Sequence, residues 1–252
     1  MVVLKTSKEL AKMKRAGSIS AQALQVGGAA VRPGVTTGEI DRAVRSFIQS
    51  KGAIPSFLGY GGFPGSACVS VNDEIIHGIP GGRVIQEGDI VSIDVGAIYK
   101  GYHGDCAATF ACGQVSAQAR RLIEVTRASF FEGLRFAREG CRLGDIGFAI
   151  QSYVEKAGFS VVRQYVGHGI GTEMHEEPEV PNYGMPGRGL RLLPGMVIAV
   201  EPMVNEGTFD VKVLPDKWTV ITADGKLSAH YENTLAITKG EPEILTICNL
   251  EE

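Results

Sequence analysis

Five acidic and imidazole side chains lie in short, unusual sequence contexts and could together bind metal ions. In chain order they are Asp94, Asp105, His168, Glu201 and Glu232. Four buried carboxylates repel one another and lose hydration, so a fold that gathers them needs compensating cations. Oxygen ligands with one imidazole suit a pair of divalent metals, and two-metal sites are typical of hydrolases. The set therefore predicts a dinuclear hydrolytic site.

The acidic residues are predicted to lie on strands. The segment 90–95 is short and β-branched, and the chain returns over 102–110. If this hairpin is symmetric about Tyr99 and Lys100, Asp94 and Asp105 are direct cross-strand neighbours, with Cβ atoms about 4.5–5.5 Å apart. A second hairpin is predicted around Asp224-Gly225, between strands at 218–222 and 227–238 that include Glu232. We expect a mainly antiparallel sheet with helices on one face.

Four helices are predicted from apolar spacing, near 7–28, from Thr36 to a stop at Gly52, near 116–138 and near 143–157. Thr6 with Glu9, and Thr36 with Glu39, have the spacing of capping boxes, which mark the first two helix starts. Basic residues near the N-terminus follow helical spacing with Glu9 and are expected to form a solvated face. They are Lys5, Lys8, Lys12, Lys14 and Arg15.

An internal repeat suggests two similar halves. Residues 32–47 align with 138–153, and 88–94 align with 195–201 at nearly the same offset. We expect one catalytic domain, 1–252, whose halves, about 5–112 and 113–240, are related by a pseudo-two-fold axis. Such an axis would place Asp94 and Glu201 on opposite sides of one site.

Composition limits the function classes. The chain has 252 residues, 44% hydrophobic and 21% charged, with a net charge of −3, so it can bury a large core but has no electrostatic signature for nucleic acid or membranes. No apolar run reaches transmembrane length. Five cysteines without a C-x-x-C pair argue against a disulfide framework: Cys68, Cys106, Cys112, Cys141 and Cys248. A cytoplasmic monomer is expected.

The five residues and their contexts resemble those of methionine aminopeptidases of the pita-bread metallopeptidase family. The resemblance covers roughly 5–240, and no long insertion separates His175 from Glu201, so the chain is similar to the short bacterial type I form. It implies an α+β pita-bread fold with two pseudo-two-fold related halves and a mainly antiparallel curved sheet with helices outside. The closest matches are Val69-x-Val-Asn72-x-x-x-x-His77-Gly-Ile-Pro80, Gly88-Asp-x-Val-x-Ile-Asp94, Gly167-His-Gly-Ile-Gly171-x-x-x-His175-Glu-Glu-Pro178 and Glu201-Pro202.

The resemblance implies a role for each metal ligand. Asp94 would bind one metal, and His168 and Glu201 would complete the second. Asp105 and Glu232 would bridge both. A water bridging the metals would be the nucleophile, and Glu201 would pass its proton to the leaving amine. The two ions would be Co, Mn, Fe or Zn.

The resemblance also implies substrate contacts. His77 would hold the scissile amide, and His175 would stabilise the oxyanion. Soft and aromatic side chains would form the methionine pocket: Tyr60, Phe63, Cys68, His77, Met174, His175 and Trp218. Phe57 and Met174 replace the cysteine and phenylalanine of the bacterial pattern. A monovalent cation, Na or K, is expected near Asn72, Glu74 and Ser228.

The implied activity is removal of the N-terminal methionine from nascent proteins whose second residue is small. Nascent N-termini are the expected partners, with the ribosome as a further candidate. Two alternatives share the fold. An Xaa-Pro aminopeptidase usually carries a separate N-terminal domain, and a non-catalytic binding module lacks the ligands. His103 and His230 adjoin the ligands and are expected to support the site rather than bind metal.

Overall fold

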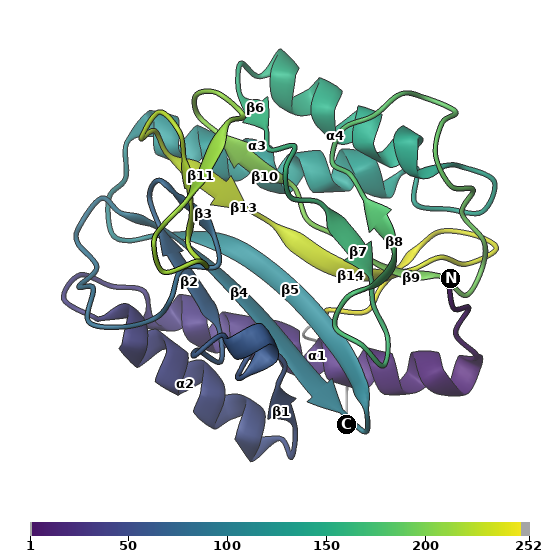
Figure 1. Ribbon diagram of the computed structural model, residues 1–252, viewed down its shortest axis with the longest axis horizontal. Helices are drawn as coiled ribbons and strands as arrows, with labels where there is room; N and C mark the ends of the chain where they lie inside the picture. Colours follow the sequence, from purple (N-terminus) through teal and green to yellow (C-terminus); the bar gives the residue numbers. More distant parts are fainter. Residues whose placement is uncertain (1, 248–252) are drawn as a thin grey trace.

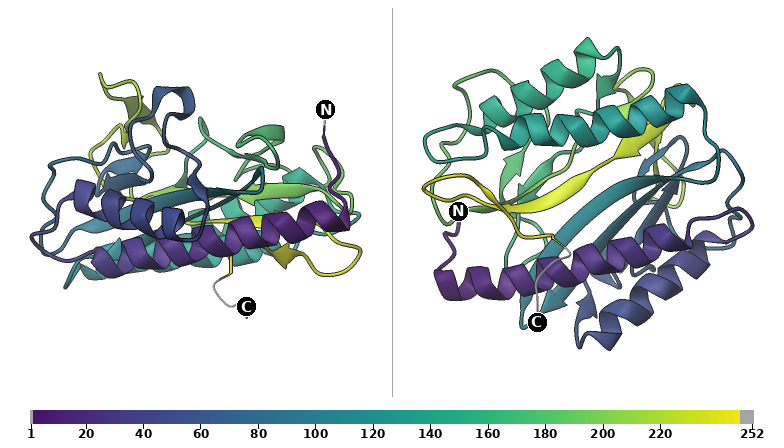
Figure 2. Two further views of the ribbon diagram at one scale, coloured as in Figure 1. Left: turned by 90° about the horizontal axis from the view of Figure 1, so that it is seen from below. Right: turned by 180° about the vertical axis from the view of Figure 1, so that it is seen from behind.

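Four helices pack on one face of a central antiparallel sheet in the computed structural model, which describes residues 2–247 (Figures 1 and 2). The four predicted helices are confirmed. Capping boxes at Thr6–Glu9 and Thr36–Glu39 start the first two, because each Glu side chain bonds the N-cap backbone while the Thr hydroxyl accepts from the Glu N–H. The helices are α1 (Ser7–Ala30), α2 (Thr37–Ser50), α3 (Ala117–Leu134) and α4 (Leu143–Lys156).

The central sheet has the strand order β1-β4-β5-β14-β9-β7-β8, and these neighbouring strands are antiparallel. Two further strands join it, β2 beside β4 and β15 beside β14. β14 thus lies between β5, from the first half of the chain, and β9, from the second half. The strands are β1 (Ile54–Pro55), β2 (Cys68–Val71), β4 (Ile90–Tyr99), β5 (Tyr102–Ala111), β7 (Gly167–Gly169), β8 (Glu176–Val180), β9 (Val197–Val200), β14 (Glu232–Ala236) and β15 (Glu243–Ile244).

The predicted register of the first hairpin is wrong by two residues. Lys100 and Gly101 both have positive φ, 48° and 79°, so they form a two-residue turn and Tyr99 pairs with Tyr102. Asp94 consequently pairs with Ala107, and Asp105 pairs with Gly96. The two aspartates are diagonal rather than direct neighbours, but they remain on the same face because strand side chains alternate with a period of two.

The hairpin predicted around Asp224-Gly225 is also wrong. The chain turns there, but the flanking strands pair with segments from elsewhere in the chain. β12 pairs with β3 and β11, and β13 pairs with β10. These small sheets contain β3 (Glu74–Ile76), β6 (Ser160–Val161), β10 (Met203–Asn205), β11 (Val211–Val213), β12 (Val220–Thr222) and β13 (Ser228–His230).

The two helix pairs cover one face of the central sheet side by side, α1 with α2 and α3 with α4 (Figure 2, right). Each pair has its own apolar core. Ile40, Val44 and Ile48 of α2 belong to one cluster, whereas Ile146 and Ile150 of α4 belong to another. Equivalent bridges occur beside the start of α2, Thr36 with Val84, and beside the start of α4, Arg142 with Arg191. This is the expected α+β class with two similar halves.

Among residues 2–247, no helix is long and apolar enough to cross a membrane. Four cysteines in this range are free thiols. Cys248 lies outside the described residues. One expectation about the surface is wrong: Lys5 is not part of a solvated face but is buried, 8% exposed.

Candidate active site

A cavity of about 310 Å³ is lined by all five predicted ligands and all predicted pocket residues. The predicted lining residues are Phe57, Tyr60, Phe63, Cys68, His77, Asp94, Asp105, His168, Met174, His175, Glu201, Trp218 and Glu232. Sequence reasoning missed four others, Ile76, Gln164, Tyr165 and Val166. The last three directly precede the Gly167-His168 motif, and this adjacency is the only feature of the sequence that could have indicated that they line the cavity.

Five adjacent strands of the sheet each supply one of the five ligand candidates. Asp94 lies on β4, Asp105 on β5 and Glu232 on β14. Glu201 directly follows β9, and His168 lies on β7. Because these strands are neighbours in the order β4-β5-β14-β9-β7, ordinary strand pairing brings residues far apart in sequence to one place.

Asp105 and Glu232 are buried, Asp94 and Glu201 are half-buried, and three of these four carboxylates lack a hydrogen-bond partner for one oxygen. Asp105 and Glu232 are 3% and 2% exposed. One oxygen each of Asp94, Asp105 and Glu232 is buried without a hydrogen bond. Burial raises the pKa of Asp94 to about 7, and burial together with neighbouring carboxylates raises those of Asp105, Glu201 and Glu232 well above the usual range. Unpaired, clustered anionic oxygens are the donor set that divalent cations require, so the residues fit metal ions.

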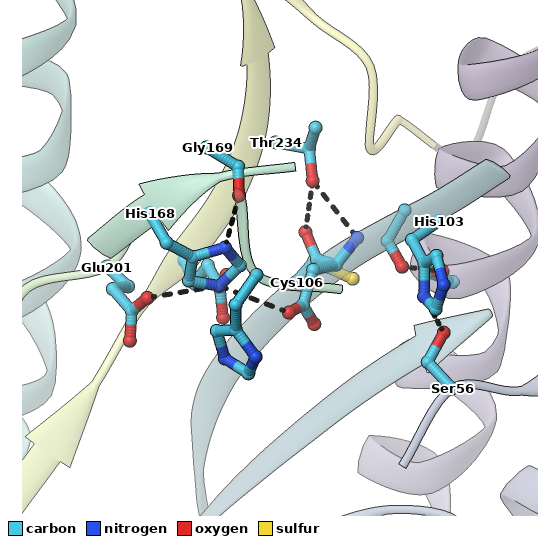
Figure 3. Close-up of polar contacts among 12 residues, drawn as sticks. Ser56, His103, Cys106, His168, Gly169, Glu201 and Thr234 are labelled. Carbon is cyan, nitrogen blue, oxygen red and sulfur yellow. Dashed lines mark hydrogen bonds and ion pairs between the residues drawn. The ribbon is translucent and has the colours of Figure 1, made fainter. Parts of the chain in front are cut away.

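His168 is oriented toward these carboxylates by its own strand. Its Nδ1 lies 2.8 Å from the Gly169 carbonyl oxygen, which only accepts, so Nδ1 carries the hydrogen (Figure 3). The free Nε2 lies 3.9 Å from Asp105 Oδ2 and 3.7 Å from Glu201 Oε1. Burial lowers the pKa of His168 to about 4, which keeps the ring neutral. A neutral imidazole fixed through its other nitrogen is the usual form of a metal-binding histidine.

The two neighbouring histidines differ in position. His103 Nδ1 lies 3.0 Å from the Ser56 hydroxyl, a structural contact (Figure 3). His230 is fully enclosed, and its Nε2 has no hydrogen-bond partner among the described residues. That atom lies 3.8 Å from Glu201 and 4.0 Å from Glu232, close enough for the three to share an ion. His230 was expected only to support the site, whereas its position permits direct binding of an ion.

His77 and His175 both line the cavity that contains the ligand cluster. His77 has φ of 58°, a conformation that costs a non-glycine residue about 1–2 kcal/mol, so the surrounding structure must impose it. Burial lowers its pKa to about 4. His175 is exposed, and its Nδ1 lies 2.7 Å from the Tyr60 hydroxyl. Its ring centroid is 4.3 Å from that of His168, so it is placed beside the ligand cluster.

The side wall of the cavity is apolar and contains two sulfur atoms. Phe57, Phe63, Cys68 and Met174 form one buried cluster, and the Trp218 ring packs edge-on to Phe63 at 5.1 Å. Cys68 pairs with Asp94 across β2 and β4, which brings the wall next to the ligands. An apolar, polarisable pocket beside a hydrolytic centre can select a thioether side chain.

The residues expected at a monovalent-cation site lie together, but their polar groups already have partners. The Ser228 N–H donates to the Asn72 carbonyl at 2.9 Å. The Glu74 carboxylate accepts from the Val71 N–H at 2.8 Å and pairs with Arg83 at 2.6 Å.

The chain belongs to metallopeptidase family M24, whose sequence profile matches residues 11–239. It is 56% identical to a methionine aminopeptidase of Clostridium acetobutylicum, over 98% of this chain and 100% of the relative. The crystal structure of methionine aminopeptidase from Rickettsia prowazekii superposes with a TM-score of 0.96 at 44% identity, covering 98% of this chain and 100% of the other. The pita-bread fold is therefore confirmed.

The X-Pro aminopeptidase of Thermotoga maritima shares the fold but less of the sequence. Its TM-score is 0.76 at 23% identity, and the match covers 97% of this chain but 62% of that chain. Similarity at this level shows the fold alone, so the Xaa-Pro alternative is not favoured.

Proposed function

We propose that the protein is a metal-dependent aminopeptidase that removes the N-terminal methionine of nascent proteins when the second residue is small. The observation that carries the proposal is the convergence of four carboxylates and one imidazole beside an apolar pocket with two sulfur atoms. Full-length similarity to methionine aminopeptidases supports it.

We assign Asp94 to one metal, His168 and Glu201 to the other, and Asp105 and Glu232 to both. When bound, two divalent ions would activate a water, polarise the scissile carbonyl and anchor the substrate's α-amine. Raised carboxylate pKa values, unpaired oxygens and the orientation of His168 support this assignment.

Three polar residues would transfer the proton, stabilise the oxyanion and hold the scissile amide. Glu201 would accept a proton from water and deliver it to the leaving amine. Its carboxylate lies within the ligand cluster, with Oε1 3.7 Å from His168 Nε2. His175, fixed by Tyr60, would donate a hydrogen bond to the developing oxyanion. His77 would hold the scissile amide, since its backbone conformation fixes where its ring points.

The pocket would bind the methionine side chain between Cys68, Met174 and the Phe63–Trp218 pair. The second residue of the substrate would lie toward the exposed His175 and Tyr60. Steric limits there would restrict that residue to small types.

The proposal extends to the identity of the ions and to the place where the protein acts. The ions would be Co, Mn, Fe or Zn, which all accept mixed carboxylate and imidazole ligands. The cation near Asn72, Glu74 and Ser228 would have to displace existing contacts. The protein would act as a cytoplasmic monomer on nascent N-termini, and any docking to the ribosome would use the surface around the cavity.

The test is a paired assay with Met-Ala-Ser and Ala-Pro-Ala, each with Mn, Co, Fe, Zn or no metal. Metal-dependent cleavage of the first peptide alone is the expected result. Cleavage of the second alone would establish a prolyl-type peptidase, and a folded protein that binds no metal would be a binding module. Met-Leu-Ser added in parallel should resist cleavage if the second residue must be small.

A further inference from the structure

Lys5 forms a buried ion pair with Glu176 across the molecule. Its Nζ lies 2.5 Å from Glu176 Oε2, and the two side chains are 3% and 13% exposed. The same Nζ donates to the Val3 carbonyl at 3.2 Å. Breaking a buried pair by removing one partner is costly, because the remaining charge loses its only compensation. The pair is therefore a strong constraint on both segments.

The Lys5 end of this pair is fixed to the body of the protein. The Lys5 N–H donates to the Gly195 carbonyl at 2.7 Å, just before β9. The capping box of α1 begins at the next residue, Thr6. Lys5 is held from both directions, so its ammonium group is a rigid anchor for whatever it contacts.

The Glu176 end belongs to a short segment, 171–176, that carries Met174 and His175. Glu176 Oε1 accepts from the Glu173 N–H at 3.3 Å, which closes the segment on itself. A Cβ at Gly171 would overlap both Glu176 and Lys5, so the ion pair occupies the space that this glycine leaves open. The Tyr60 hydroxyl lies 2.7 Å from Nδ1 of the His175 ring, which also packs against the rings of Tyr60 and His168.

We propose that Lys5, acting through Glu176, positions the His175 imidazole for catalysis. The inference rests on the proposed function, since it needs His175 to face the reacting carbonyl. Without the ammonium group, the Glu176 carboxylate would turn toward water and release the segment that carries His175. Lys5 is a positioning residue and does not itself touch the substrate.

The test compares Lys5→Met, Lys5→Arg and Glu176→Gln with Lys8→Met, a matched control because Lys8 is an exposed lysine three residues along the same segment. Misplacing a catalytic group by about 1 Å costs up to ~100-fold in rate, so we expect Lys5→Met to lower kcat for Met-Ala-Ser by roughly 10- to 100-fold. The KM and the metal Kd, measured by titration calorimetry, should stay within about threefold, because no ligand is altered. Lys5→Arg should recover most of kcat.

Hydrogen exchange of residues 171–177 provides a readout that does not depend on activity. It should accelerate in Lys5→Met and Glu176→Gln and stay unchanged in Lys8→Met. A variant that combines Lys5→Met with Glu176→Gln should have the same kcat as the slower of the two single variants, since both changes break the same contact. Any one of three results would overturn the proposal. They are an equal kcat in Lys5→Met and Lys8→Met, an unchanged exchange rate of residues 171–177 in Lys5→Met, or losses of kcat that add in the double variant. Should Lys5→Met fail to fold, Glu176→Gln carries the test. If the wild-type protein cleaved no peptide, the proposed function would fail, whereas exchange would still decide whether Lys5 holds the segment.

Discussion

Thr234 and Asp105 exchange two hydrogen bonds at the junction of β14 and β5. The Asp105 N–H donates to Thr234 Oγ1 at 3.0 Å, and the Thr234 hydroxyl donates to the Asp105 carbonyl at 2.8 Å. The β14–β5 ladder pairs Glu232 with Ala107 and Asn233 with Cys106. At the following position the Thr234 side chain makes the contacts to the Asp105 backbone (Figure 3). Thr234 thereby fixes the backbone that carries a ligand candidate.

Replacing Thr234 by Val should destabilise the protein and weaken metal binding. The change removes both hydrogen bonds that the Thr234 hydroxyl makes to the buried Asp105 backbone, at about 1 kcal/mol each. For a chain of this size that corresponds to a fall in Tm of roughly 2–4 °C per kcal/mol. Calorimetry measures the Tm of the metal-free protein and the affinity for Mn. Thr234→Ser keeps the hydroxyl and should behave as wild type, and a Val variant as stable as the Ser variant would contradict this role.

Removing the metals should make stability fall as pH rises. In the chelated protein the carboxylates have folded-state pKa values above their unfolded values near 4, about 7 for Asp94 and also raised for Glu232. Their contribution to stability is therefore lost as pH rises through the folded-state values. Buried histidines such as His168, whose pKa is lowered to about 4, oppose this effect below their unfolded value near 6.5. The informative window is therefore above pH 6.5.

The measurement is the Tm at several pH values from about 6.5 to 8.5, with and without chelator, a range set by the unfolded histidine pKa. The chelated protein should lose stability across this window, and the metal-loaded protein should not, because the cations compensate the ionised carboxylates. Parallel profiles for the two forms would show that the carboxylates do not share a metal site.

Tyr60→Phe should reduce catalysis by loosening His175. The variant keeps the ring and loses the 2.7 Å contact to Nδ1. A hydrogen bond of about 1 kcal/mol corresponds to a roughly fivefold loss in kcat/KM for Met-Ala-Ser. Tyr165→Phe is the comparison, because that ring lines the same cavity and packs on His77 instead. Equal losses in the two variants would argue against a specific role for the Tyr60 hydroxyl.

Glu9→Gln should lower the Tm at neutral pH but not in strong acid. Hydrogen bonds from the Thr6 side chain and backbone, and from Tyr102, lower the pKa of Glu9 from 4.5 to about 2. A lowered folded-state pKa contributes stability above the unfolded value that disappears as pH falls through the folded value. The Tm difference from wild type should therefore be full above pH 4.5 and shrink toward pH 2. An unchanged difference at both ends would rule out the carboxylate as its source. The exposed Glu124→Gln on α3 is the control.

Local patterns predicted the features that depend on neighbouring residues. The capping boxes at Thr6 and Thr36 need only a Glu three residues later, and both are present. The β4–β5 hairpin was found, but its register depends on which residues form the turn. Because Lys100 and Gly101 both adopt positive φ, the centre of the hairpin moves by one residue and the pairing by two.

Contacts between distant segments could not be predicted in the same way. A turn at Asp224-Gly225 shows that the chain reverses, but not that β12 pairs with β3 and β13 with β10. Lys5 looks like its exposed neighbours because Glu176, which buries it, lies 171 residues away. Asp105 and Thr234 are 129 residues apart, and nothing near either one indicates the other.

The place of β14 in the sheet has a consequence for the order in which the protein matures. β14 lies between β5 and β9, so residues 232–236 provide the backbone bridge between these strands. They are also among the last residues of the sheet to be synthesised. Four ligand candidates precede Glu232 in the chain, but the strands that carry them are joined in one sheet only when β14 is in place. An enzyme that trims nascent chains would therefore remain unable to bind its full metal complement until residues 232–236 of its own chain have been synthesised and have joined the sheet.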